Sequence, residues 1–265
     1  MIDTYHILFL IILIITKIQA CNNSEDIYET EIIKNKILYD YKKGSGAYYI
    51  AYSPFRDDFI DVTSFVRLPT KIGTNNGTRT GFISFGVQGQ YGYIDMGIMN
   101  SGKGWKPYYN DNGDLISFDD WTANDDVKIM GLEIEIYTKK IINFYVSFRN
   151  STEDEISEKF FKEIYSSHIF EGYEEGKPNL RLYRFVSLVN NKDKGIPDDQ
   201  NDRTAMIGGA FTKLELKFNN DQDGNWGING DYVEASWKVS PKKIEFDYYT
   251  DNNGKTFDNF SIKYF

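Results

Sequence analysis

Apolar and polar residues alternate along most of this chain, which is the pattern of β-strands that bury one face. In residues 91–99 the positions 94, 96 and 98 are apolar, whereas Tyr93 and Asp95 fall on the opposite face. The same alternation covers residues 132–136 and resumes at 142–148, with two lysines between, so we expect a hairpin with one apolar face. It returns at residues 214–218, 233–237 and 244–248. The pattern predicts an all-β chain.

Residue pairs that favour tight turns separate these segments. They are Asn112-Gly113, Asp223-Gly224, Asn229-Gly230 and Asn253-Gly254. Such pairs tolerate positive φ at the tips of hairpins. Short strands with regular turns predict an antiparallel β-sandwich, jelly-roll-like, over residues 40–265.

One segment departs from the alternation. Residues 151–167 begin with Ser/Thr and acidic residues and then place Ile156, Phe160 and Ile164 four apart, which predicts one amphipathic helix at 152–167. The residues before and after this predicted helix show a faint sequence similarity to each other, in which Trp105 and Trp226 occupy comparable places. The chain could therefore consist of two related β halves, 40–150 and 170–265, around the helix.

The N-terminus predicts export. Residues 7–15 are an unbroken apolar run, too short to span a bilayer, and Ala20 precedes a cleavage point. We therefore expect a signal peptide at 1–20, a linker at 21–39, a secreted protein and no transmembrane helix in its mature form. The sequence before Cys21 also resembles a bacterial lipobox, so a lipid anchor at Cys21 is the alternative.

Composition narrows the chemistry. A net charge of −9 disfavours nucleic acid and anionic membranes as partners. With Cys21 as the one cysteine, no disulfide closes within the chain and zinc sites of several Cys and His ligands are excluded. His168 is the one histidine beyond the leader, and we interpret it as an ordinary residue at the end of the predicted helix.

Two carboxylates could support hydrolysis. Glu133 and Glu135 lie two apart on a predicted strand and so share a face about 6 to 7 Å apart, the separation that suits a nucleophile and an acid. The run Glu-Ile-Glu-Ile resembles the carboxylate strand of the concanavalin-like jelly-roll glucanases, which implies a glycoside hydrolase or lyase. The third acidic position of that motif is Tyr137 here. Asp95 is a further candidate acid, and solvated charges on an exposed face are the structural alternative.

Aromatic residues gather in a segment rich in Gly and Asn. We expect them to stack on sugar rings, with Tyr93 and Asp95 on the adjoining strand face; the residues are Trp105, Tyr108, Tyr109 and Trp121. The alternative is that Trp105 and Trp121 cap the core.

No cofactor is expected. Asn219, Asp221 and Asp223 copy the opening of a calcium loop, but position twelve is Gly230, so calcium at Asp221 and Asp223 stays the lesser alternative to a hairpin turn.

These observations favour a secreted or surface-attached, non-catalytic carbohydrate-binding protein. Its alternatives are the glycoside hydrolase or lyase with Glu133 and Glu135, and a surface or adhesion protein whose partner is another protein. A β-sandwich hosts all three functions.

Overall fold

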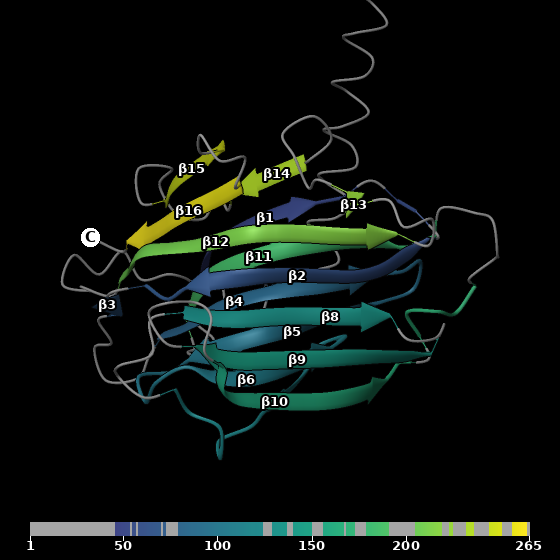
Figure 1. Ribbon diagram of the computed structural model, residues 1–265, viewed down its shortest axis with the longest axis horizontal. Helices are drawn as coiled ribbons and strands as arrows, with labels where there is room; N and C mark the ends of the chain where they lie inside the picture. The colour runs from purple at the N-terminus through teal and green to yellow at the C-terminus, as the bar shows by residue number, and fades with distance from the viewer. Residues whose placement is uncertain are drawn as a thin grey trace, which may run out of the picture. The chain divides into compact units, whose positions relative to one another are not determined.

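A computed structural model describes the following parts of the chain: residues 46–53, 55–56, 58–69, 71–72, 79–123, 129–136, 140–149, 156–166, 168–172, 179–190, 205–218, 223–224, 232–235, 244–250 and 256–263. They form two antiparallel sheets, so the predicted all-β sandwich is confirmed. The strands of the two sheets lie one behind the other in Figure 1.

The seven-stranded sheet has the order β14-β1-β11-β4-β5-β6-β7. Its strands are β14 (Tyr232–Ala235), β1 (Gly46–Tyr52), β11 (Arg181–Asn190), β4 (Arg79–Gln88), β5 (Tyr93–Asn100), β6 (Lys106–Asp111) and β7 (Asp114–Ser117). The run β4 to β7 is a meander of consecutive strands. β11 enters between β1 and β4, and so joins segments far apart in the sequence.

The nine-stranded sheet has the path β10-β9-β8-β2-β12-β16-β15, with β3 and β13 also paired to β12. Its strands are β10 (Ile156–Tyr165), β9 (Ile141–Arg149), β8 (Ile129–Ile136), β2 (Phe59–Arg67), β12 (Ala205–Phe218), β16 (Thr256–Lys263), β15 (Ile244–Thr250), β3 (Lys71–Ile72) and β13 (Asp223–Gly224). Strands β2, β8, β9 and β10 carry the residues that matter most below.

The inward faces of both sheets form one apolar core. Phe85 of β4 stacks on Phe211 of β12 at 5.5 Å between ring centroids, which joins the two layers. The alternation expected for residues 91–99 is confirmed, because the side chains at 94, 96 and 98 are fully buried in this core. The core therefore fixes which residues of each strand face outward.

The predicted hairpin is also confirmed. β8 pairs with β9 so that Leu132 lies opposite Val146 and Ile134 opposite Phe144, all of them buried. At the other predicted turn, Asn112 and Gly113 have φ of 52° and 111°, in the left-handed region that a two-residue hairpin loop requires. Asp223-Gly224 is instead the short strand β13, because its backbone pairs with β12.

The predicted helix at 152–167 is wrong. Residues 156–165 form β10, which pairs with β9 along its length, and no helix occurs in the parts of the chain that the structure describes. Ile156, Phe160 and Ile164 are four apart, a spacing that fits one side of a helix and equally one face of a strand. Phe160 and Ile164 are buried, so pairing with β9 and burial against the core decide the conformation.

Strands from residues 46–149 and from residues 156–263 both contribute to each sheet: β11 lies between β1 and β4, and β12 pairs with β2. Among the described residues no helix is long and apolar enough to cross a membrane. The leader, the linker, Cys21, Trp226 and the turns at 229–230 and 253–254 lie outside the described residues.

Candidate functional site

The outward face of the nine-stranded sheet carries a group of mostly polar side chains on β9, β8 and β2. Strand register sets Tyr145, Glu133 and Thr63 in one row across β9, β8 and β2, and Ser147, Gly131 and Phe65 in the neighbouring row. Successive rows on a strand are two residues, or about 7 Å, apart. We call this surface the β8 groove.

A cavity of about 210 Å³ opens in the β8 groove. Gly131 lines this cavity, and a Cβ added there would lie 2.2 Å from the hydroxyl oxygen of Ser147. The charged residues around it come from four strands and are Glu133, Arg149, Lys159 and Glu215. The groove is therefore hollow because β8 carries a glycine where its neighbours carry side chains.

Glu133 is a carboxyl of the groove with a perturbed pKa. Its side chain is half-buried, and burial raises its pKa above the ordinary value of a glutamate. Lys159 and Lys217 oppose that rise, whereas Asp61 and Glu135 add to it. A carboxyl with a raised pKa that borders an open cavity is suited to take up and return a proton.

Glu135 lies on the same outward face, in the next row, and is engaged differently. It accepts hydrogen bonds from Asn143 Nδ2 at 3.1 Å and from the Tyr145 hydroxyl at 3.5 Å. These two partners hold the Glu135 carboxylate in place. Of the two glutamates named from the sequence, only Glu133 lines the cavity.

Two cations stand beside the same hollow. Arg149 donates from Nε to the Ser147 hydroxyl at 3.3 Å, and its guanidinium lies 4.3 Å from the centroid of the Phe65 ring. The ammonium of Lys159 lies 4.1 Å from the centroid of the Tyr145 ring. Both charges are thus placed by neighbouring aromatic rings at the edge of the cavity.

The third candidate acid, Asp95, belongs to the other sheet. It is 3% exposed, on the face of β5 opposite the core, where the hydroxyl of Tyr183 donates to one carboxylate oxygen and Asn110 Nδ2 donates to the other at 3.2 Å. Burial raises the pKa of Asp95 to about 7, although both hydrogen bonds favour the ionised form. Asp95 also raises the pKa of the buried Tyr108, second to burial itself.

The aromatic residues named from the sequence do not share one surface. Tyr108 and Tyr93 lie on the same face as Asp95, and Tyr108 is fully buried against Phe82. Trp105 is a core residue at 6% exposure, and Trp121 and Tyr109 pack against that core. Trp121 contacts Phe148 and Phe160 with ring centroids 6.3 and 5.5 Å apart.

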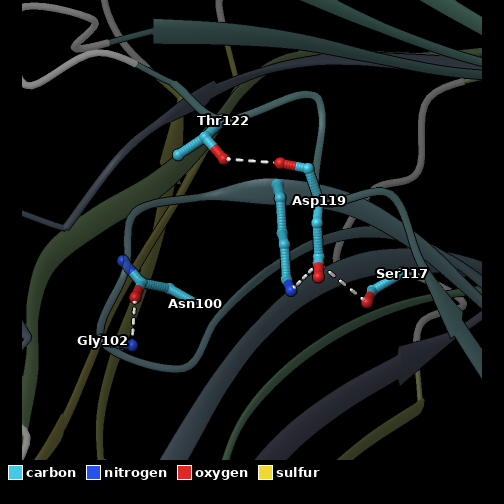
Figure 2. Close-up of polar contacts among 6 residues, drawn as sticks. Asn100, Gly102, Ser117, Asp119 and Thr122 are labelled. Carbon is cyan, nitrogen blue, oxygen red and sulfur yellow. Dashed lines mark hydrogen bonds and ion pairs between the residues drawn. The ribbon is translucent and has the colours of Figure 1, made fainter.

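Polar contacts fix the segment between the two tryptophans (Figure 2). Asp119 pairs with Lys106 and accepts from the Ser117 hydroxyl at 3.3 Å, while its carbonyl accepts from the Thr122 hydroxyl at 3.3 Å. The amide of Ala123 donates to the carbonyl of Trp105 at 2.8 Å. These bonds close the segment over the core, which explains the burial of Trp105.

Other named residues lie elsewhere. His168 has an acidic partner that the sequence did not indicate, because its Nε2 lies 2.6 Å from Asp111 Oδ1. Asp221 lies outside the described residues and Asp223 is in β13. Within the described ranges no cluster of three His, Cys, Asp or Glu side chains could hold a metal ion.

Sequence reasoning missed the groove residues Tyr145, Ser147, Arg149 and Lys159. The first three alternate with buried Phe144, Val146 and Phe148 on β9, so the polar face of that strand was a usable signal. Lys159 could not be placed, because the segment around it was assigned to a helix.

Comparison with known proteins gives the fold but no family. No family model matches the chain, and no curated protein is similar to it in sequence. Scytalido-glutamic peptidase with a peptide-based transition state analog is similar in structure at 9% identity, covering 82% of this chain and 100% of that one with a TM-score of 0.51. The same peptidase with a transition state analog inhibitor is 10% identical, and the match covers 82% of this chain and 100% of that one with a TM-score of 0.51. SCP-B, a member of the eqolisin family of peptidases in complex with a tripeptide, is 9% identical, and the match covers 82% of this chain and 100% of that one with a TM-score of 0.50.

These similarities correct the sequence-based interpretation. The three solved structures named above are of peptidases, and this finding contradicts the prediction of a non-catalytic carbohydrate-binding protein. They also overturn the assignment to a concanavalin-like, carbohydrate-binding group, of which only the β-sandwich remains.

Proposed function

We propose that this protein is a hydrolase of peptide bonds in which Glu133 is the acid–base residue of the β8 groove. The observation that carries the proposal is the position of Glu133, half-buried, with a raised pKa, at the wall of an open cavity. The likeness of the fold to three solved peptidase structures supports an amide bond as the target.

The groove residues suit the two proton transfers of amide hydrolysis. Ionised Glu133 takes a proton from a water molecule, whose oxygen attacks the peptide carbonyl carbon to give a tetrahedral oxyanion. Lys159, whose charge interacts with Glu133, supplies positive charge near that oxyanion. The protonated Glu133 then returns its proton to the departing amine as the C–N bond breaks.

Glu133→Gln tests the proposal because glutamine keeps the shape of the side chain but cannot carry the proton. We expect hydrolysis of a quenched fluorescent peptide library to fall by about a hundredfold or more, the scale of acid–base catalysis. Stability should change little. Since the pKa of Glu133 is raised, the rate should increase with pH through a range above that of an ordinary glutamate. Glu163→Gln, at an exposed position on β10, is the matched control.

Two results would contradict this assignment. Cleavage by the Glu133→Gln variant at the rate of the parent would exclude Glu133. Loss of cleavage in Asp95→Asn, with Glu133→Gln fully active, would move the catalytic group to the other sheet.

We also propose that the enzyme acts outside the cell. The apolar leader ends at Ala20, so mature protein from the native source should begin at Cys21. Sequencing of its N-terminus decides this, because an intact Met1 contradicts export by cleavage. An acylated Cys21 would identify the lipid-anchored form.

A further inference from the structure

Strand β10 forms one edge of the nine-stranded sheet and is the lowest labelled strand in Figure 1. It pairs along its length with β9, and no strand of the described ranges pairs with its other side. The amide of Ser166, just after β10, donates to the carbonyl of Lys140, just before β9, at 3.1 Å. Since backbone groups alternate in direction along a strand, those of residues 159, 161, 163 and 165 point away from β9. This edge therefore offers a row of backbone donors and acceptors to a further strand.

The outward side chains of β10 are exposed and partly aromatic. Phe161 and Tyr165 are 51% and 65% exposed, and the Phe161 ring lies 4.9 Å from the Tyr145 ring of β9, measured between centroids. Lys159 and Glu163, which flank Phe161 on the same face, are exposed as well. Charged residues on an edge strand usually discourage pairing with another chain. Here the two charges have opposite signs and lie at equal distances on either side of an aromatic ring.

That arrangement is complementary to itself. When two copies of β10 pair antiparallel with Phe161 opposite its counterpart, each Lys159 lies opposite the partner's Glu163. No other antiparallel register of β10 with itself sets these two residues opposite each other. Opposite charges and aromatic rings at facing positions stabilise a pair of strands. A symmetric contact of this kind is complete with two copies.

We infer that two copies of this protein associate through β10, in the register centred on Phe161. Each nine-stranded sheet then continues into that of the second copy, and its outward face gains two ion pairs around one pair of aromatic rings. The backbone groups on the open side of β10 gain hydrogen-bond partners in the second copy. Dimer formation does not depend on the catalytic role proposed for Glu133, so either proposal can fail without the other.

Sedimentation velocity at several protein concentrations measures the association. We expect the parent to change from monomer to dimer as its concentration rises. Glu163→Lys sets a lysine opposite the partner's Lys159 at both ends of the contact, and Lys159→Glu sets a glutamate opposite the partner's Glu163. Each variant should weaken the dimer by about tenfold or more, since two attractive cross-strand pairs become repulsive. Glu171→Lys, at an exposed position outside β10, is the matched control and should dimerise like the parent.

An equimolar mixture of the two charge variants gives a sharper result. In a dimer of one Lys159→Glu chain with one Glu163→Lys chain, both facing pairs again have opposite signs. The mixture should therefore dimerise at concentrations where each variant alone is monomeric, which also shows that both variants are folded. A mixture that stays monomeric overturns the inference, and so does a parent dimer that both substitutions leave intact. A parent that is monomeric at every concentration overturns it as well, and would leave the edge to a strand of another protein.

Discussion

Replacement of Asp95 by asparagine is expected to remove a strong loss of stability at neutral and alkaline pH. The pKa of Asp95 is about 7 in the folded protein, against 3.8 for an ordinary aspartate. The folded state therefore holds a proton that the unfolded chain has already released between these two values. The stability that this proton contributes is fully present below pH 3.8 and is lost as the pH rises through 7.

The expected size follows from the difference between a pKa of about 7 in the folded protein and 3.8 in the unfolded chain, which corresponds to about 4 kcal/mol between pH 4 and pH 8. Denaturant unfolding of the parent and of Asp95→Asn at several pH values measures it. Between pH 4 and pH 8, the free energy of unfolding of the variant should rise by about 4 kcal/mol relative to that of the parent. Asn110 can turn its amide to meet the new side chain, and Tyr183 can still donate to the amide oxygen.

Asp114→Asn, at an exposed position of the neighbouring hairpin, controls for the loss of one negative charge. A constant difference between the parent and Asp95→Asn at every pH would contradict the prediction, since it would mean that Asp95 has the same pKa in the folded and the unfolded protein.

The second large effect is expected at Trp105. The side chain is in the core, and its carbonyl is bonded to the amide of Ala123. Trp105→Ala leaves a cavity that its neighbours cannot fill, so we expect the free energy of unfolding to fall by about 3 to 5 kcal/mol. Tyr91→Ala, at 55% exposure, is the control and should cost little. An unchanged denaturation midpoint for Trp105→Ala would show that the segment closing over the core is absent in solution.

Strand alternation made much of this fold predictable. The buried positions 94, 96 and 98 and the β8–β9 hairpin follow from a period of two, because one face of each strand must pack on the core. The same reasoning placed Glu133 and Glu135 together on the outward face. It failed at β10, where Ile156, Phe160 and Ile164 satisfy both periods, and only pairing with β9 distinguishes strand from helix.

Alternation could not have found the chemical environments. Asp95, Gly86 and Tyr183 are aligned across β5, β4 and β11, and β11 is distant in sequence from the other two strands. A Cβ on Gly86 would lie 1.9 Å from Tyr183 Cζ, so the tyrosine ring crosses the glycine to reach Asp95. No local sequence pattern indicates that crossing. It helps to bury Asp95, and burial raises the pKa of Asp95.

The sequence by itself therefore determined the strands with clear alternation at 91–99, 132–136 and 142–148, the turn at Asn112-Gly113 and the outward direction of Glu133, since each depends on a few neighbouring residues. The tertiary structure decided which outward residues meet. It set Arg149 and Lys159 beside the hollow over Gly131, buried Asp95 under Tyr183, and drew Trp105 into the core. Those contacts depend on how segments tens of residues apart are aligned in the sheets. This register decides whether a carboxylate stays in water or is buried, and burial is what raises its pKa.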